Sequence, residues 1–299
     1  MRGASFAAAI AALFVAVPLS GPAIAQAPAR FSVPFHAGSD GLVLLDAELD
    51  GIRAVRTLLD TGDAAPYAVL IGPALSARAG LQPTGGHRTS RAEIGSVPAA
   101  FRSVAVGSFR LGAIRLERPS AADSPAVETA SGASGRRFEA VIGGVFLRDH
   151  RVSIDYVHAR VTFDGAVPTT AAVRFVTAPG RPAVIVRATV NGAGPFALVL
   201  DTGATVTILS TSTARRAGLR LGRPVALYGG GGRARGVRSL AREIRVGSAR
   251  RSGARVVVAD VLGPANAEAG TALEGVLGAP FFAGRRLTID YPRGVLWIE

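Results

Sequence analysis

Short runs in which hydrophobic and polar residues alternate account for most of the chain, and turn-forming residues separate them. This period-two pattern is typical of β-strands, and the β-branched residues within the runs support the same assignment. The sequence has no long stretch with the helical spacing of apolar residues. The pattern therefore predicts an all-β protein. In the second half the expected strands include VRSLAREIRVG, ARVVVAD, RLTIDY and GVLWIE.

The chain also repeats itself. Residues 42–62 (LVLLDAELDGIRAVRTLLDTG) align with residues 183–203 (AVIVRATVNGAGPFALVLDTG), so that Asp60 falls on Asp201 at an offset of 141 positions. In each copy an Asp-Gly or Asn-Gly pair lies between two apolar runs, which is a strong signal for a tight β-hairpin. Each half is therefore expected to begin with a hairpin whose second strand leads into Asp-Thr-Gly.

Two further landmarks recur in the same order. The segments PALSARAGL and STSTARRAGL both predict a short helix ended by glycine, with Ser210 or Ser212 as the N-cap of the second copy. Nearer the end of each half, VIGGVFLRDHRVSIDY matches VLGAPFFAGRRLTIDY. These matches predict two similar β-barrel lobes related by pseudo-twofold symmetry, each with one short helix.

The boundary between the lobes is expected where residues 165–180 are rich in proline, glycine and alanine. This gives an N-terminal lobe at residues 26–170 and a C-terminal lobe at residues 171–299. Residues 119–135 (PSAADSPAVETASGASG) are small and polar, and we expect them to form a surface loop.

The first residues have the pattern of an export signal. A basic residue precedes an apolar stretch, Phe6–Val17, and Ala23-Ile24-Ala25 supplies a small-residue cleavage pattern. The stretch is too short to span a bilayer, which favours a removed signal peptide at residues 1–25 over an uncleaved anchor. We therefore expect a periplasmic or secreted protein without stable membrane insertion after the signal is removed.

The composition narrows the possible chemistry. The chain contains no cysteine, which excludes disulfides, thiolate metal sites and cysteine nucleophiles. Its formal net charge is +13, and every basic side chain apart from histidine is arginine. A basic balance can favour acidic substrates, anionic membranes or nucleic acid. Because the arginines are scattered through both halves and no aromatic-interleaved basic stretch occurs, we expect no nucleic-acid partner.

Twice along the chain, an apolar pair precedes Asp-Thr-Gly and a second apolar pair, further on, precedes glycine. On these motifs the sequence resembles the aspartic protease superfamily, and specifically the bacterial exported retropepsin-like proteases with two lobes in one chain. The resemblance covers nearly all of residues 26–299 and implies two retropepsin-like lobes. The motif residues are Leu58, Leu59, Asp60, Thr61, Gly62, Val141, Ile142 and Gly143, then Val199, Leu200, Asp201, Thr202, Gly203, Val276, Leu277 and Gly278.

This resemblance implies an aspartic endopeptidase whose catalytic pair is Asp60 and Asp201, one from each lobe. Two carboxyls about 3 Å apart cannot both ionise, so they share a proton, and one acts as base while the other acts as acid. Such a pair can activate water for peptide hydrolysis without a metal, and its two pKa values belong to the pair. We therefore expect a polypeptide substrate, no cofactor and no metal.

Other motif residues are expected to support the two active loops. The glycines of the triplets would allow close approach of the lobes. The resemblance assigns hydrogen bonds between the loops to the triplet threonines, and it places the second motif of each half in a strand beneath each loop. The residues with these supporting roles are Thr61, Gly62, Thr202, Gly203, Ile142, Gly143, Leu277 and Gly278.

A substrate cleft also needs a cover. By position, the run Tyr228-Gly229-Gly230-Gly231-Gly232 in the second half and Thr84-Gly85-Gly86-His87 in the first resemble flap hairpins, and glycines suit their motion. No P-loop pattern accompanies the glycine run, so it is not expected to bind a nucleotide. Tyr228 would contact substrate, or it would be a packed aromatic at a strand end.

The first copy departs from the pattern. Asp63 follows its triplet, where Ala204 follows the second, and AAPYAVLIG lacks the Ser/Thr-rich run ATVTILS. A third carboxylate could raise the pKa of the pair or recruit an arginine, or it could simply point to solvent. A divergent first lobe leaves open a catalytically weak or inactive relative that binds peptides or envelope components. A homodimer of second lobes is another alternative, but the internal partner favours a monomer.

Other active-site chemistries lack support in the sequence. The four histidines have no metal-binding spacing, and no G-x-S-x-G motif for a serine nucleophile occurs. Asp155 and Asp290 repeat as faithfully as the Asp-Thr-Gly triplets. We expect them at strand ends, where they would make structural hydrogen bonds.

Overall fold

The computed structural model describes residues 30–90, 98–178, 181–263, 266 and 272–299. The predicted signal peptide lies outside these residues. The described part of the chain is mostly β-strand, arranged in three sheets, and the all-β prediction is confirmed. The strands expected from VRSLAREIRVG, ARVVVAD, RLTIDY and GVLWIE are β19, β20, β22 and β23, whose bounds are given below.

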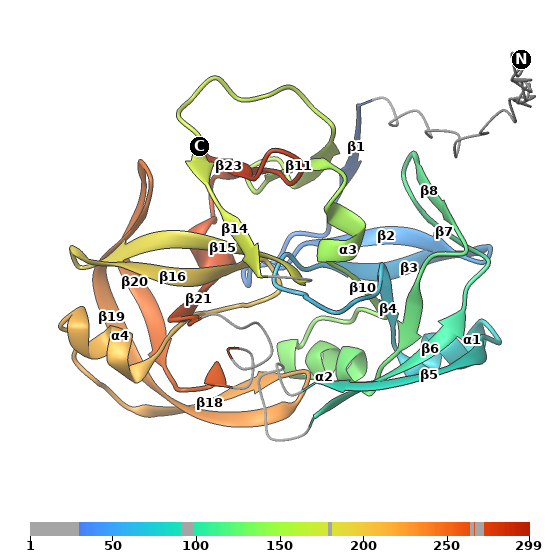
Figure 1. The fold of residues 1–299 in the computed structure, drawn as a ribbon, viewed down its shortest axis with the longest axis horizontal. Helices are drawn as coiled ribbons and strands as arrows, with labels where there is room; N and C mark the ends of the chain where they lie inside the picture. Colours follow the sequence, from blue (N-terminus) through green and yellow to red (C-terminus); the bar gives the residue numbers. More distant parts are fainter. Residues whose placement is uncertain (1–29, 91–97, 179–180, 264–265, 267–271) are drawn as a thin grey trace, which may run out of the picture.

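The first half of the chain folds mainly into one sheet, on the right of Figure 1. Its strand order is β5-β6-β9-β4-β10-β3-β2-β7-β8. The strands are β2 (Leu44–Leu49), β3 (Ile52–Leu59), β4 (Val69–Ile71), β5 (Gln82–Ser90), β6 (Ala99–Ala105), β7 (Ser108–Leu111), β8 (Ile114–Glu117), β9 (Ala121–Asp123) and β10 (Ala140–Ile142).

The second half forms the corresponding sheet on the left of Figure 1, in the order β14-β15-β16-β21-β17-β20-β19-β18. Its strands are β14 (Val176–Ala178), β15 (Arg181–Val190), β16 (Ala193–Asp201), β17 (Thr207–Leu209), β18 (Pro224–Gly229), β19 (Gly232–Val246), β20 (Ala249–Val258) and β21 (Gly275–Gly278).

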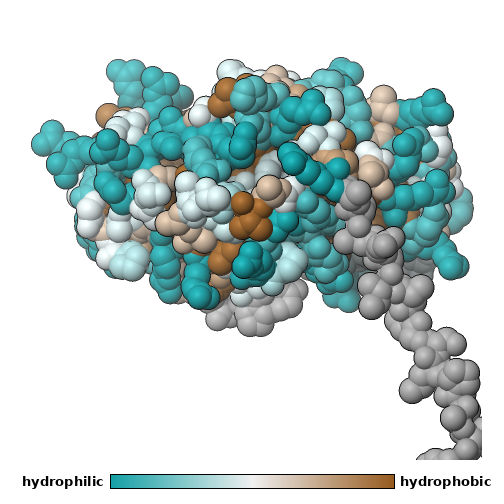
Figure 2. Space-filling model, turned by 90° about the horizontal axis from the view of Figure 1, so that it is seen from above, coloured by the Kyte–Doolittle hydropathy of each residue, from teal (hydrophilic) through white to brown (hydrophobic). Residues whose placement is uncertain are grey.

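Strands from both halves share the third sheet, which lies at the top of Figure 1 in the order β1-β12-β11-β22-β23-β13. At its centre β11 and β22 pair antiparallel, and each places an aspartate opposite an arginine of the other half. Seen from this side, the surface is mainly hydrophilic with small apolar patches (Figure 2). The strands are β1 (Phe31–Pro34), β11 (Arg151–Asp155), β12 (Arg160–Phe163), β13 (Val173–Arg174), β22 (Arg286–Asp290) and β23 (Val295–Ile298).

The hairpins predicted from the repeat form as expected. Asp50 and Gly51 have φ angles of 47° and 82°, and Asn191 and Gly192 have 53° and 86°. These are two-residue turns with positive φ at both positions, the geometry that Asp-Gly and Asn-Gly favour between twisted strands. In each half, therefore, the second strand of the hairpin leads directly into the Asp-Thr-Gly triplet.

The prediction of one short helix per lobe is wrong for the first half. Its described residues hold three helices, and those of the second half hold one α-helix, a short 3-10 helix and helical positions at residues 263 and 266. In the second half the predicted helix is present, and Ser210 rather than Ser212 is its N-cap. The helices are α1 (Pro73–Arg78), α2 (Pro125–Ser134), α3 (Gly144–Leu147), α4 (Thr211–Arg216) and η1 (Ala279–Phe281).

Helix α2 replaces the surface loop that we expected at residues 119–135. The hydroxyl of Ser124 accepts a hydrogen bond from the amide of Ala126, and a proline occupies the first helical position. Gly135, with a φ of 68°, ends the helix. Val127 is buried, so packing against the rest of the lobe stabilises this helix. Its small polar residues alone do not predict a helix.

Candidate active site

The two triplets meet where the lobes meet. Asp60 directly follows β3, and Asp201 is the last residue of β16. In each half a short parallel strand supports the loop: the amide of Asp60 donates to the carbonyl of Ile142 at 3.0 Å, and Asp201 lies opposite Gly278 in the ladder. These are the strands that the family resemblance places beneath each loop. The repeated chain thus presents one aspartate from each half at the same point.

The threonines of the triplets interlock across the interface between the halves. The hydroxyl of Thr61 donates to the carbonyl of Leu200 at 2.8 Å and accepts from the amide of Thr202 at 3.1 Å. The hydroxyl of Thr202 does the same in reverse, donating to the carbonyl of Leu59 at 2.7 Å and accepting from the amide of Thr61 at 3.1 Å. Both side chains are buried. This reciprocal set relates the two loops as a twofold axis would.

The triplet glycines leave room for the opposite aspartate. A Cβ atom on Gly62 would lie 2.5 Å from Cγ of Asp201, and one on Gly203 would lie 2.5 Å from Oδ2 of Asp60. Each glycine amide also donates to the aspartate of its own triplet, at 2.8 Å in both halves. Glycine is therefore required here by close approach, since any side chain would occupy the position of a carboxyl group.

Burial raises the pKa of both carboxyls. For Asp60, a hydrogen bond with Asp201 and backbone amide donors, including that of Gly62, counteract this effect. For Asp201, the facing charge of Asp60 and the hydrogen bond between the two add to it, so its pKa lies well above the usual range. The pair therefore shares one proton over a range of pH in which one carboxyl is ionised and the other is protonated. This is the charge state that an acid and base pair needs.

Asp63 turns back towards its own loop. Its Oδ1 accepts from the amide of Ala65 at 3.0 Å, and a Cβ atom on Gly143 would lie 2.3 Å from its Oδ2. The side chain is half-buried and packs against the supporting loop, so it does not simply point to solvent.

The two active loops also differ in one supporting hydrogen bond. In the second half the hydroxyl of Thr207 accepts from the amide of Gly278 at 3.2 Å. Pro66, at the matching position of the first half, has no hydroxyl to accept such a hydrogen bond.

Two tyrosines near the pair were not singled out from the sequence. Tyr156 and Tyr291 follow the repeated Asp155 and Asp290. Burial raises the pKa of each hydroxyl, and the carboxylates of Asp201 and Asp60 add to the effect on Tyr156 and Tyr291 respectively. Among the described residues neither hydroxyl has a hydrogen-bond partner. The signal that could have identified them was the IDY repeat itself.

The aspartates lie in a cleft of about 760 Å³ that both lobes line. Its walls are largely apolar, with one cluster from each half. The wall residues of the first half include Leu42, Leu58, Leu70, Phe101, Val127, Phe138 and Val141. Those of the second half include Ile185, Val199, Ile208, Leu227, Val257, Leu262 and Val276. An extended, mostly apolar chain segment fits such a cleft.

A hairpin of the second half covers the cleft. Strands β18 and β19 pair up to Gly229 and Gly232, so the predicted run from Tyr228 to Gly232 forms the tip of a hairpin. Tyr228 lines the cleft and is 57% exposed, so it is not a packed aromatic. In the first half, the segment from Thr84 to His87 lies within β5, where the register shifts. The turn of that hairpin lies outside the described residues.

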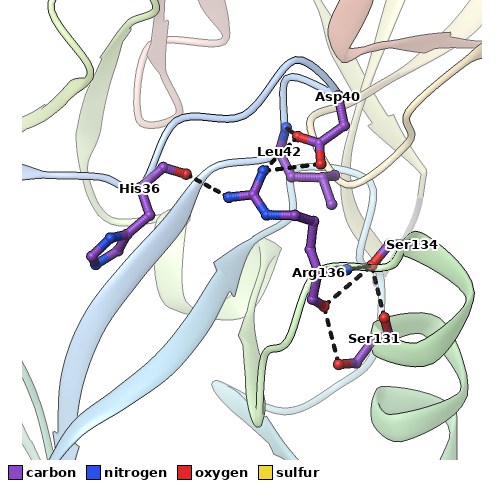
Figure 3. Close-up of polar contacts among 6 residues, drawn as sticks. All are labelled: His36, Asp40, Leu42, Ser131, Ser134 and Arg136. Atoms are coloured by element: carbon purple, nitrogen blue, oxygen red, sulfur yellow. Dashed lines mark hydrogen bonds and ion pairs between the residues drawn. The ribbon is translucent and has the colours of Figure 1, made fainter.

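Helix α2 of the first half lies beside β18 and forms the other side of the cover (Figure 1). Arg136 fixes its C-terminal end (Figure 3). The Arg136 guanidinium donates to both carboxylate oxygens of Asp40 at 3.0 Å and to the carbonyl of His36 at 2.9 Å. The hydroxyls of Ser131 and Ser134 donate to the carbonyl of Arg136. The cover is thus built from unlike parts of the two halves.

The remaining candidates take structural roles. Asp155 accepts from the amide of His158 and from the guanidinium of Arg286, whereas Asp290 accepts from Arg151. Burial alone would raise the pKa of Asp155, but these hydrogen bonds hold that pKa well below its usual range.

Within the described ranges no group of three or more histidine, aspartate or glutamate side chains could hold a metal ion. None of the described helices is long and apolar enough to cross a membrane.

Comparison with known protein families matches part of the second half of the chain. Residues 186–281 match the family model described as aspartyl protease. The matched segment runs from β15 to η1 and includes the second Asp-Thr-Gly triplet and the strand beneath it. A search of curated proteins found no match. The family match supports assignment to an aspartyl protease family, and it does so through the second half of the chain.

Proposed function

We propose that this protein is an aspartic endopeptidase that hydrolyses peptide bonds with a water molecule activated between Asp60 and Asp201. The observation that carries the proposal is the pair itself: two buried carboxyls from different halves, each beside the glycine of the other triplet, in one apolar cleft. The family match to the second half agrees with this chemistry.

In this mechanism the two carboxyls divide the work. Ionised Asp60 accepts a proton from water as the water oxygen attacks the peptide carbonyl carbon, and protonated Asp201 gives its proton to the carbonyl oxygen. The tetrahedral diol then collapses. Asp201 takes back a proton from one diol hydroxyl, the C–N bond breaks, and the leaving nitrogen takes the proton that Asp60 received from water. Because the cleft is largely apolar, it strengthens the electrostatic interactions of the pair with the reacting atoms.

The same arrangement favours a monomeric enzyme. The threonine hydrogen bonds and the β11–β22 pairing already join the two halves of one chain. A lobe from a second copy would have to displace the lobe of the same chain. The lobe of the same chain is always present at the higher effective concentration. We also propose that residues 1–25 direct export and that the mature chain acts in the periplasm or outside the cell.

Cleavage of an unfolded test protein tests the proposal. Purified residues 26–299 should cut it between pH 3 and 8, and Asp60→Asn and Asp201→Asn should each abolish cleavage while leaving the fold intact by circular dichroism. Loss in Asp201→Asn alone would make the first lobe a scaffold and favour a dimer, which light scattering would reveal. Folded wild-type protein that cuts nothing yet binds peptides would overturn the endopeptidase in favour of a binding relative.

A further inference from the structure

The excess positive charge belongs to one half of the molecule. Residues 30–170 hold 15 arginines and 14 acidic residues, so that half is nearly neutral. Residues 171–299 hold 18 arginines but only 7 acidic residues. An even spread of arginine along the sequence therefore hides a strong asymmetry in net charge. The second half therefore carries almost all of the net positive charge, and an anionic ligand would be attracted mainly to that half.

The ion pairs follow the same division. In the described first half most arginines lie within reach of a carboxylate, as in the pairs of Arg78 with Glu139 and Arg102 with Asp123. In the described second half few do, such as Arg216 with Glu274. Surface arginines without such a partner keep their full capacity to bind an external anion.

Three of these arginines lie along the cleft side of the hairpin sheet. Arg238 lines the cleft and stands opposite Val257 in the β19–β20 ladder. Its amide donates to the carbonyl of Arg223 at 2.9 Å, so Arg223 continues the β18–β19 ladder beside it. Val225, two residues beyond Arg223, packs against the apolar cluster of the cleft. Strand alternation therefore places Arg223 on the cleft side as well.

Arg255 completes the set. It lies two residues before Val257 on β20, and Val257 belongs to the apolar wall of the cleft. The same alternation puts Arg255 on the cleft side, diagonal to Arg238, and diagonal neighbours are within reach of long side chains. We call Arg223, Arg238 and Arg255 the arginine row. All three are exposed, and no carboxylate of the described residues pairs with any of them.

The carboxylates that line the cleft are Asp60, Asp63 and Asp201, among the described residues. They lie at the active loops, where the catalytic pair would act on the substrate. Arg238 lines the second-lobe wall opposite Val257, and Arg223 and Arg255 flank it on the same face of the sheet. A peptide in the cleft would thus meet apolar contacts near the aspartates and a row of guanidinium groups further along.

We infer that the arginine row is a specificity subsite that binds acidic side chains of the polypeptide substrate, away from the scissile bond. Guanidinium groups form charge-assisted, often bidentate hydrogen bonds with carboxylates, which suits them to select glutamate or aspartate over their amides. This inference rests on the proposed endopeptidase activity. It adds that the preferred substrates combine apolar residues at the cleavage site with an acidic residue at one flanking position.

Peptide pairs that differ only by Glu or Gln at one position test the subsite. At pH 5 a peptide glutamate with an ordinary pKa of about 4.3 is mostly ionised. We expect Glu at one flanking position to raise kcat/KM roughly tenfold, the change that corresponds to one modest ionic contact. The preference should fall with added salt. In the triple variant Arg223→Gln, Arg238→Gln, Arg255→Gln the Glu-to-Gln ratio should drop to about one.

Arg235→Gln is the matched control. Arg235 lies on the same strand, is exposed, and is three residues before Arg238, so strand alternation turns its side chain to the other face of the hairpin. This variant should keep the wild-type Glu-to-Gln ratio, because it removes the same charge from a place that substrate does not reach. An equal loss of preference in Arg235→Gln would mean that only net charge matters and would overturn the subsite.

Binding to the Asp201→Asn variant separates this inference from the proposed activity. Fluorescence anisotropy with the Glu and Gln peptides needs no cleavage. If wild type cuts nothing but binding favours Glu through the arginine row, the endopeptidase fails and the subsite stands. If wild type cuts both peptides equally and the triple variant behaves identically, the subsite fails and the endopeptidase stands.

Discussion

Thr61 and Thr202 exchange hydrogen bonds in a twofold arrangement. The hydroxyl of each accepts from the amide of the other threonine and donates to the carbonyl two residues before that other threonine. Both threonines are buried, so water cannot replace a lost partner. The contact therefore fixes the distance between the two active loops.

Replacing Thr202 by valine should destabilise the protein by about 3 kcal/mol, because it leaves the amide of Thr61 and the carbonyl of Leu59 unsatisfied. Thr202→Ser keeps the hydroxyl and should cost about 1 kcal/mol or less through the lost methyl group. Urea unfolding of both variants measures the difference. Equal losses in the two variants would show that the hydroxyl is not what joins the loops.

The glycine of the second triplet offers a steric test. Gly203→Ala would place a methyl group 2.5 Å from a carboxylate oxygen of Asp60, and we expect it to reduce kcat/KM by about 100-fold. Gly132→Ala is its control, since Gly132 lies in α2 with nothing within 4 Å of an added Cβ. That change should stabilise the helix by about 0.5–1 kcal/mol and leave activity unchanged. Normal activity in Gly203→Ala would contradict the observed approach.

The raised pKa of Asp201 makes a prediction about stability and pH. The folded protein holds a proton that the unfolded chain releases near the ordinary value of 3.8, so this group stabilises the fold at low pH. That contribution is lost as pH rises through the folded pKa, by roughly 1.4 kcal/mol for each unit of elevation. Asp201→Asn cannot ionise. It should therefore melt at a higher temperature than wild type at pH 7.

The same comparison at low pH provides the control. At pH 3, below the ordinary value of 3.8, the carboxyl of Asp201 is mostly protonated in both the folded and the unfolded protein, so the advantage of Asp201→Asn should largely disappear there. Thermal melts across pH 3 to 7 measure the trend. A constant difference between variant and wild type would show that the effect of the substitution is steric and not electrostatic.

The ion pair of Arg151 with Asp290 joins the lobes through the shared sheet. Asp290 is buried, and its carboxylate lies 3.1 Å from the guanidinium of Arg151. Asp290→Ala should cost about 3 kcal/mol, because it leaves a largely buried charge without its partner. As a control, Glu117→Gln breaks a pair exposed on both sides and should leave stability nearly unchanged. Similar losses in chemical unfolding would contradict the structural role of Asp290.

Local sequence signals predicted the parts of this fold that depend on local geometry. Asp50-Gly51 and Asn191-Gly192 specify their hairpins because few other residues tolerate positive φ at both turn positions. The repeat of Asp-Thr-Gly then indicated that Asp60 and Asp201 belong together, since two copies with matched flanks imply a twofold arrangement. Helix α2 was missed because its small polar residues carry no apolar periodicity, and its stability comes from a cap and from packing.

By itself, then, the sequence determined the strand pattern and the two hairpins, because these depend on residues close together in the chain, and its internal repeat indicated which aspartates are paired. Only the tertiary structure decided which neighbours surround that pair. It placed α2 of one half against β18 of the other, and it put Tyr156 and Tyr291 near the carboxyls of the opposite halves. It also aligned Arg223, Arg238 and Arg255, because strand register brings together residues that no local pattern connects.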